Sequence, residues 1–354
     1  MSTKLKVDDR IAILRKGSES RSNTGNMAMV KGMNRTTLGF VIALSLTLML
    51  SARSQAWAPQ RNVEFIVPTA SGSSMDVLAR AIADLWQQRH LVNTSITVQA
   101  KPGSGGAIAW SYVSRKTGDG HVIAISGPTL VANDILGIGD LSYKDVTPIA
   151  QLFTEYTTFV VHKDSPIRSA DELVATLRTA TPPSVGIAPG FGSSSHAAIL
   201  KLARAAAILP DRMTVVPFKG ANESVTAVLG RHIDVAIATM SVIAPFLAGG
   251  ELRAIAIAAP QRLAGSPIPT WRESGLDVVE GNWRGVVGAR DLGDAEVAFW
   301  NERLADVAKS DAWAENLKRN AWNADFSSAV DSRRFLGQQY DEMRATFATI
   351  HLGK

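Results

Sequence analysis

The chain has 354 residues, of which 46% are hydrophobic and 19% charged, and this composition excludes a disordered or fibrous protein. It contains no cysteine, which excludes disulfides and thiol-bound metal, so its folded part must be stabilised by core burial alone. The net charge of +5 comes from residues 1–56, which hold nine Lys or Arg and three Asp or Glu and leave 28 basic and 29 acidic residues in the remainder. That near-neutral remainder excludes the basic surface by which proteins bind nucleic acid.

The first predicted element is a secretory signal. An apolar run of 13 residues from Leu38 to Leu50 follows Lys31 and Arg35 and precedes small residues. The run is shorter than the roughly 20 residues that a membrane-spanning helix needs. We therefore predict that residues 1–56 are an upstream extension and a signal peptide cleaved after Ala56, and that the mature protein is periplasmic.

From residue 63 onward, short β-rich runs alternate with helical periodicity, which predicts an α/β protein with largely parallel sheets. The strands are expected at 63–67, 96–99, 121–126, 185–188, 214–216, 235–238 and 252–258. Helices are expected at 75–89, after residues 106, 169, 193, 220 and 240, and over the last sixty residues. The segments 149–161 and 281–287 are predicted to cross between two lobes, so that 57–159 with 282–354 form lobe 1 and 160–281 form lobe 2.

A hydroxyl-rich loop follows the first expected strand and leads into a helix. Its candidate ligand-binding residues are Thr69, Ser71, Gly72, Ser73, Ser74 and Asp76. The start of a helix has unpaired backbone N–H groups and a partial positive charge, so such a loop can bind an anion without a cationic side chain. Asp76 is expected to brace the loop by accepting backbone hydrogen bonds. The alternative is an ordinary helix cap formed by Ser73 or Ser74.

A second loop of the same kind precedes the helix that begins near residue 194. Its candidates are Gly192, Ser193, Ser194, Ser195 and His196. Glycine allows a ligand to approach the backbone, the serines supply donors, and a neutral histidine can donate through one ring nitrogen. The alternative for His196 is a role in capping or packing. Two anion-binding loops in distant parts of the chain predict a site between two lobes.

Lys219 and Gly220 form a weaker third candidate, because they also follow an expected strand and precede a helix. The alternative for Lys219 is a solvated surface charge. The glycine-rich segment 103–106 lacks the spacing of a nucleotide-binding loop, and the six histidines are scattered singly, so we expect no cofactor and no metal. A serine hydrolase using His196 as base is an alternative, but the chain has no Gly-x-Ser-x-Gly motif, and we expect no enzymatic activity.

Eight segments in register resemble one family, the solute-binding receptors of tripartite tricarboxylate transporters, often called Bug-type receptors. The resemblance covers nearly all of the chain after the leader. The segments are 66–80, 101–106, 118–121, 143–149, 192–196, 217–220, 233–234 and 249–254. The chain departs from the family pattern at Thr69, where an aromatic residue is common, at Gly72-Ser73 in place of paired glycines, and at Ala238, where an acidic residue is common.

The resemblance implies a two-lobed periplasmic binding protein of the type II-like, hinge-closing kind, with a mixed, largely parallel sheet in each lobe and a two-strand hinge. It implies a receptor, monomeric, that binds a small organic acid (a mono-, di- or tricarboxylate or an acidic amino acid) and passes it to membrane transporter subunits. In the family, the backbone N–H groups and hydroxyls of loops that correspond to Thr69–Asp76 and Gly190–His196 bind the carboxylate. An amino-acid receptor of an ATP-driven importer is the other alternative.

Overall fold

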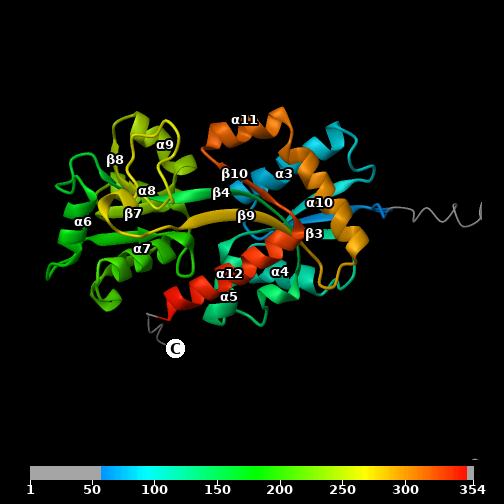
Figure 1. Ribbon diagram of the computed structural model, residues 1–354, viewed down its shortest axis with the longest axis horizontal. Helices are drawn as coiled ribbons and strands as arrows, with labels where there is room; N and C mark the ends of the chain where they lie inside the picture. The colour runs from blue at the N-terminus through cyan, green and yellow to red at the C-terminus, as the bar shows by residue number, and fades with distance from the viewer. Residues whose placement is uncertain (1–56, 349–354) are drawn as a thin grey trace, which may run out of the picture. The chain divides into compact units, whose positions relative to one another are not determined.

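The structure is a computed structural model that describes residues 57–348; the predicted extension and signal peptide lie outside the described residues. Strands and helices alternate along the chain (Figure 1). The strands are β1 (Val63–Val67), β2 (Ile96–Ala100), β3 (Val122–Ser126), β4 (Thr147–His162), β5 (Ser184–Ile187), β6 (Thr214–Pro217), β7 (Val235–Thr239), β8 (Leu252–Ile257), β9 (Gly281–Gly288) and β10 (Asn323–Ser327). The α-helices are α3 (Ser74–Gln88), α4 (Ala107–Ser114), α5 (Pro128–Leu136), α6 (Ala170–Leu177), α7 (Ser194–Ala205), α8 (Ala221–Leu229), α9 (Met240–Ala248), α10 (Asp294–Ala308), α11 (Asp311–Asn320) and α12 (Ala329–Phe347).

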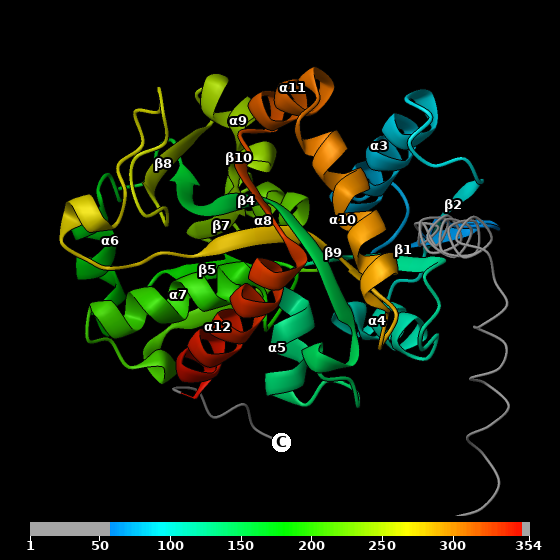
Figure 2. The ribbon, with the colours of Figure 1, turned by 45° about the vertical axis from the view of Figure 1, so that its right-hand side comes forward.

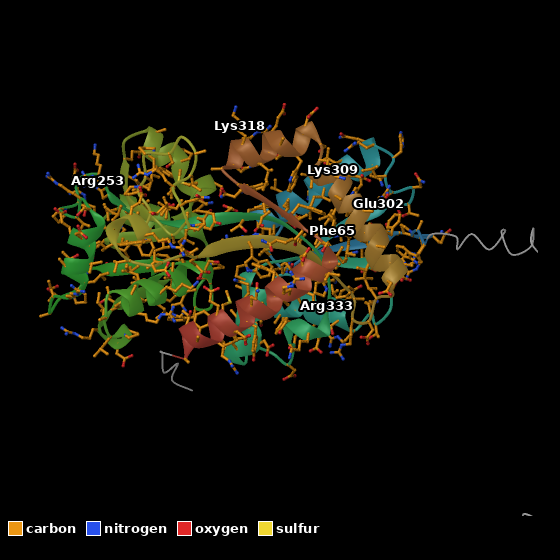
Figure 3. All side chains as sticks on the ribbon, viewed as in Figure 1. Phe65, Arg253, Glu302, Lys309, Lys318 and Arg333 are labelled. Carbon is orange, nitrogen blue, oxygen red and sulfur yellow. The ribbon has the colours of Figure 1, made fainter. Side chains whose placement is uncertain are left out.

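The first half of the sheet has the strand order β2-β1-β3-β9-β4. The strands β2, β1 and β3 are parallel to one another, while β9 is antiparallel to both β3 and β4. Apolar side chains of β1 and α3 bury themselves against α10, where Trp86 and Trp300 are fully buried with ring centroids 5.3 Å apart. Figure 3 shows Phe65 inside this half, while Lys309 and Lys318 are exposed on the outer side of α10 and α11. Burial of each large side chain contributes roughly 1.5–3 kcal/mol, which supports a core without disulfides.

The second half of the sheet continues from β4 through β7 and β5 to β6. The strands β7, β5 and β6 are parallel, and β7 and β8 each pair antiparallel with the second part of β4. The helices α6 and α7 pack around a second core that includes Phe159 and Trp271. The predicted alternation of strand and helix is therefore present in both halves.

Two long strands join the halves. Along β4, residues Thr147–Tyr156 pair with β9, and residues Thr157–Val161 pair with β7. In Figures 1 and 2, β4 and β9 run side by side from the half with α3, α4 and α10 to the half with α6, α7 and α8. These strands contain the segments 149–161 and 281–287 that were expected to cross. The fold is thus a two-lobed α/β fold with a curled mixed sheet, as predicted.

The C-terminal region differs from the expected all-helical tail. The strand β10 interrupts the helices and pairs antiparallel with β4. The last helix, α12, then packs against α5 in the first lobe and α7 in the second (Figure 2). Its contacts bury Trp283, Leu336 and Phe347 in one apolar cluster. The helix α5 was not predicted either, although Pro128 in its first turn and Gly137, in a left-handed conformation at its end, are ordinary helix boundary signals.

Candidate functional site

The first loop begins where β1 ends and is ordered by its own side chains. Ser73 caps α3 by accepting a hydrogen bond from the backbone N–H of Asp76 at 3.3 Å, and its hydroxyl lies 2.6 Å from that of Thr69. Gly72 has φ = +78°, a left-handed conformation that glycine adopts without steric cost. Ser71, Gly72 and Ser74 are exposed, so their backbone and hydroxyl groups are open to a ligand.

Asp76 braces this loop, as its position in the first turn of α3 predicted. Its carboxylate accepts the backbone N–H of Gly72 at 2.9 Å and two hydrogen bonds from Arg80, at 3.0 and 3.1 Å. The hydrogen bond from Arg80, followed by that from Gly72, lowers the pKa of Asp76 from its ordinary value. Asp76 is buried, and its two oxygens are occupied by the loop, so the structure assigns it a supporting role.

The second loop uses most of its polar groups internally. Ser193 caps α7 by accepting from the backbone N–H of His196, and its hydroxyl donates to the carbonyl of Gly190 at 2.7 Å. The hydroxyl of Ser195 lies 2.8 Å from the backbone nitrogen of Ala188 and 2.9 Å from its carbonyl oxygen. Both serines are buried, so their hydroxyls hold the loop together rather than pointing out of it.

His196 is also turned into this loop. Its Nδ1 accepts the backbone N–H of Gly192 at 3.1 Å, and its ring stacks on Phe347 of α12. Burial lowers the pKa of His196 to about 4, so the imidazole is neutral at pH 7. Because Nδ1 accepts from a backbone amide, no serine hydroxyl of the loop is paired with this ring nitrogen as a nucleophile is paired with its base.

Ser194 is the serine of the second loop that reaches toward the crossing strands. Its hydroxyl lies 3.4 Å from Oδ1 of Asn282 on β9, and the same oxygen accepts a hydrogen bond from Nη1 of Arg284 at 2.6 Å. A methyl group added at Gly127, just before α5, would lie 3.1 Å from Nη1 of Arg284 and 3.0 Å from Cε of Met75 at the start of α3. Arg284 and Asn282 therefore stand between the starts of α3 and α7.

Next to Asn282, on the adjoining strand β4, lies a carboxylate that contacts hydroxyl-bearing residues. Glu155 of β4 stands opposite Asn282 in the β4–β9 register and is 4% exposed. Its carboxylate accepts a hydrogen bond from Ser241 at 2.7 Å, and Ser241 also contacts the hydroxyl of Thr239. Gly127, Glu155, Asn282 and Arg284 are not among the site residues predicted from the sequence. A charged residue inside each apolar crossing segment was the signal that could have revealed Glu155 and Arg284.

The third candidate pair is not joined to these loops. Lys219 is exposed, and its backbone N–H donates to the side chain of Glu223, while Gly220 precedes the first turn of α8. Within residues 57–348, no hydrogen bond or ion pair connects Lys219 or Gly220 to the first or second loop. Neither does this described part of the chain contain a group of His, Asp or Glu side chains arranged to hold a metal ion.

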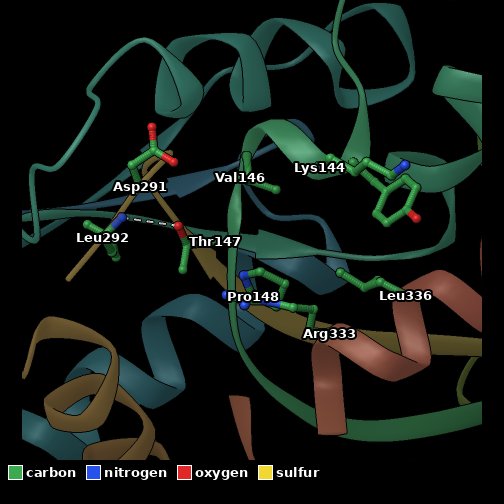
Figure 4. Close-up of a pocket in the computed structure, with 9 residues that line it drawn as sticks. Lys144, Val146, Thr147, Pro148, Asp291, Leu292, Arg333 and Leu336 are labelled. Atoms are coloured by element: carbon green, nitrogen blue, oxygen red, sulfur yellow. Dashed lines mark hydrogen bonds between the residues drawn. The ribbon is translucent and has the colours of Figure 1, made fainter. Parts of the chain in front are cut away.

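A cavity of about 350 Å³ lies away from both loops, between the start of β4, the segment after β9 and α12 (Figure 4). Its lining includes Lys144, Asp291 and Arg333, and its wall is held by a hydrogen bond from the backbone of Leu292 to Thr147. It is partly open to solvent and touches none of the predicted site residues. Because its volume suits a small molecule, it is the competing location for a ligand.

The fold and the two helix-start loops define a two-lobed α/β binding protein. Residues 78–352 match the model of the tripartite tricarboxylate transporter family receptor, so the chain belongs to that family, as the sequence motifs predicted. BugT of Bordetella pertussis is 26% identical over 318 residues, covering 87% of this chain and 95% of BugT. MatC from Rhodopseudomonas palustris, solved with bound malate, has a TM-score of 0.71 and 25% identity over 81% of this chain and 99% of MatC. A second R. palustris protein, solved with adipate, has a TM-score of 0.73 and 24% identity over 82% of this chain and 97% of that protein.

Proposed function

We propose that this protein binds a small organic carboxylate between its two lobes and delivers it to a membrane transporter of the tripartite tricarboxylate type. Membership of the receptor family and the malate and adipate of the two R. palustris proteins support this proposal. The observation that carries it is the position of Ser194, Asn282 and Arg284 between the helix starts of α3 and α7.

In this proposal the first lobe comprises 57–159 with 282–354, and the second comprises 160–281. A carboxylate docks at the exposed first loop, where Ser74 presents its backbone N–H group and its hydroxyl at the start of α3; the N–H groups of Gly72 and Ser73 already donate to Asp76 and Ala70. The second lobe then closes and adds donors from the start of α7, Ser194 among them. Ser193, Ser195, His196 and Asp76 fix the shapes of the loops.

The expected affinity follows from the number of hydrogen bonds. Three or four charge-assisted hydrogen bonds contribute roughly 1.5–3 kcal/mol each, and lost motion costs several kcal/mol. The remaining free energy of about 8 kcal/mol corresponds to a micromolar dissociation constant. No bond is made or broken in this scheme, so the protein acts as a receptor and needs no cofactor.

The proposed location is the periplasm, reached through a signal peptide within residues 1–56 that is cleaved after Ala56. The family's receptor role and the apolar run at 38–50 support this location. Between residues 57 and 348, no helix has the length and apolar character that crossing a membrane requires. Amino-terminal sequencing of the exported protein tests the cleavage site, and a start upstream of Leu38 would contradict it.

A thermal-shift screen of the expressed protein tests the proposed function. The panel contains mono-, di- and tricarboxylates together with aspartate and glutamate, because the buried carboxylate of Glu155 can accept hydrogen bonds from a ligand ammonium group. A ligand that binds only the folded state at 100 times its dissociation constant stabilises that state by about 2.7 kcal/mol. We expect at least one organic acid to raise the melting temperature by several degrees; a flat response to every acid would contradict the proposal.

A further inference from the structure

Arg284 is a buried cation without an anionic partner. Arg284 is 8% exposed, and within residues 57–348 it forms no ion pair. Its two hydrogen bonds both use Nη1 and go to uncharged oxygens, the side-chain oxygen of Asn282 at 2.6 Å and the backbone carbonyl of Trp283 at 2.9 Å. Nε and Nη2 have no hydrogen-bond partner in the described part of the chain. The guanidinium therefore has unused hydrogen-bond donors, and it lies on a strand that crosses between the lobes.

The surroundings of Arg284 place those donors at the proposed site. The guanidinium lies beside Gly127, which Met75 at the start of α3 also approaches, and it shares Asn282 with Ser194 of the second loop. Burial lowers the pKa of Arg284, and the charge of Glu155 raises it. Glu155 is not in ion-pair contact with Arg284, and its carboxylate takes a hydrogen bond from Ser241 instead.

A buried and unpaired charge is costly, and proteins normally pair such charges or bind an ion with them. The cost is recovered when an anion binds, because hydrogen bonds between a guanidinium and a carboxylate are short, strong and often bidentate. Backbone amides and hydroxyls can hold one carboxylate at the helix starts. They leave Nε and Nη2 of Arg284 without a hydrogen-bond acceptor unless the ligand brings a second negative group.

We infer that Arg284 binds the second carboxylate of the ligand and thereby selects dicarboxylates over monocarboxylates of the same length. This inference rests on the proposed function, since it assigns one end of the ligand to the helix-start loops. It adds a specificity-determining residue that lies on β9, outside both loops. A monocarboxylate loses a hydrogen bond to a charged group. We therefore expect it to bind about tenfold or more weakly than the dicarboxylate of the same length.

The test is isothermal titration of the whole expressed chain with succinate, malate, glutarate and adipate, each paired with its monomethyl ester. The ester keeps the carbon chain of the acid, adds one methyl group and removes one negative charge. We expect any bound diacid to bind about tenfold or more tightly than its ester. Arg284→Met should reduce this ratio to below about threefold, mainly by weakening the diacid, while Arg284→Lys should retain part of it because lysine keeps the charge but lacks the planar fork.

Arg61→Met is the matched control. Arg61 precedes β1, outside both loops; it already pairs with Asp119 and its side chain is 58% exposed, so its loss should leave the diacid-to-ester ratio unchanged. Circular dichroism checks that each variant is folded, and if Arg284→Met does not fold, the wild-type ratio and Arg284→Lys decide the question. A wild-type ratio near one, or a ratio that survives in Arg284→Met, overturns the inference and leaves the proposed function standing. Failure of every acid and ester to bind wild type overturns both.

Discussion

The hydroxyl of Ser194 at the start of α7 lies 3.4 Å from Oδ1 of Asn282 on the crossing strand β9. This contact joins the second loop to the strand that carries Arg284, and Arg284 in turn adjoins Met75 at the start of α3. The proposed site is therefore organised around the crossing strands, with one helix start on each side.

Ser194→Ala should weaken organic-acid binding by about tenfold, because one hydrogen bond to a charged group contributes roughly 1.5–3 kcal/mol. The melting temperature of the free protein should change little, since the cap of α7 is Ser193 and Ser194 makes one long hydrogen bond. Calorimetric titration measures the affinity, and an unchanged dissociation constant would remove Ser194 from the site. The double variant Ser194→Ala/Ser195→Ala should lose at least as much affinity.

Ser195→Ala should act on stability first. Its hydroxyl contacts both the backbone nitrogen and the carbonyl oxygen of Ala188, and its removal leaves these buried groups without their partner. The expected loss in the free energy of unfolding is about 1–3 kcal/mol. Urea denaturation measures it, and a loss below about 0.5 kcal/mol would show that the hydroxyl does not support the loop.

Asp76→Asn should loosen the first loop, because asparagine cannot offer two charged oxygens to Gly72 and Arg80. We expect a loss of about 1 kcal/mol in unfolding free energy at pH 7. The folded pKa of Asp76 is lowered, so its contribution is fully present above its unfolded pKa, about 3.9, and is lost as the pH falls through the lower folded value. Denaturant titrations of wild type and variant should therefore converge in acid below pH 4; a gap that widens there would contradict this assignment.

The buried Lys201 joins α7 to two carboxylates, at 2.6 Å from Glu280 before β9 and at 2.5 Å from Glu342 on α12. Burial raises the pKa of Glu280 to about 7, against the opposing attraction of Lys201. Lys201→Met should cost about 3–5 kcal/mol at pH 8, because it leaves the carboxyl group of Glu280 buried without its partner, so that this group must take up a proton on folding. At pH 5.5 Glu280 of the variant takes up its proton more readily than at pH 8, so the loss in unfolding free energy should be smaller.

Denaturation of the Lys201→Met variant at the two pH values checks this expectation. Glu342→Gln is the matched control, because the side chain of Glu342 is 47% exposed and its loss should cost less than about 1 kcal/mol. A loss in Lys201→Met that grows on acidification would show that Glu280 is not the group responsible.

The sequence predicted the parts of the fold that local signals determine. The cap of α3 is Ser73, one of the two serines expected there, and the position of Asp76 in the first turn predicted that it braces the loop. Seven of the strands were predicted from short apolar, β-rich runs, while β4 and β9 were predicted only as segments that cross between the lobes. The family itself was predicted from eight short segments and is confirmed by the match over residues 78–352.

The rest depends on contacts between distant residues. Asn282 and Arg284 lie in a segment predicted only as a crossing, and their approach to Ser194 and Gly127 follows from tertiary packing. The strand β10, with the sequence Asn-Ala-Asp-Phe-Ser, has only two apolar residues, both exposed, and is defined by its pairing with β4. The hydroxyls of Ser193 and Ser195 were expected to face a ligand, yet local geometry directs them into the loop, and no sequence pattern distinguishes these two orientations.

The central claim is that a carboxylate is held between the starts of α3 and α7, next to Arg284. The direct test is a crystal structure of the protein with a bound diacid, namely the one that raises the melting temperature by the largest amount. We expect one carboxylate of the ligand within hydrogen-bond distance of Ser74 at the start of α3 and of Ser194 at the start of α7, and the other at the guanidinium of Arg284. A ligand bound instead in the cavity lined by Lys144 and Arg333, with the two loops unoccupied, would contradict it.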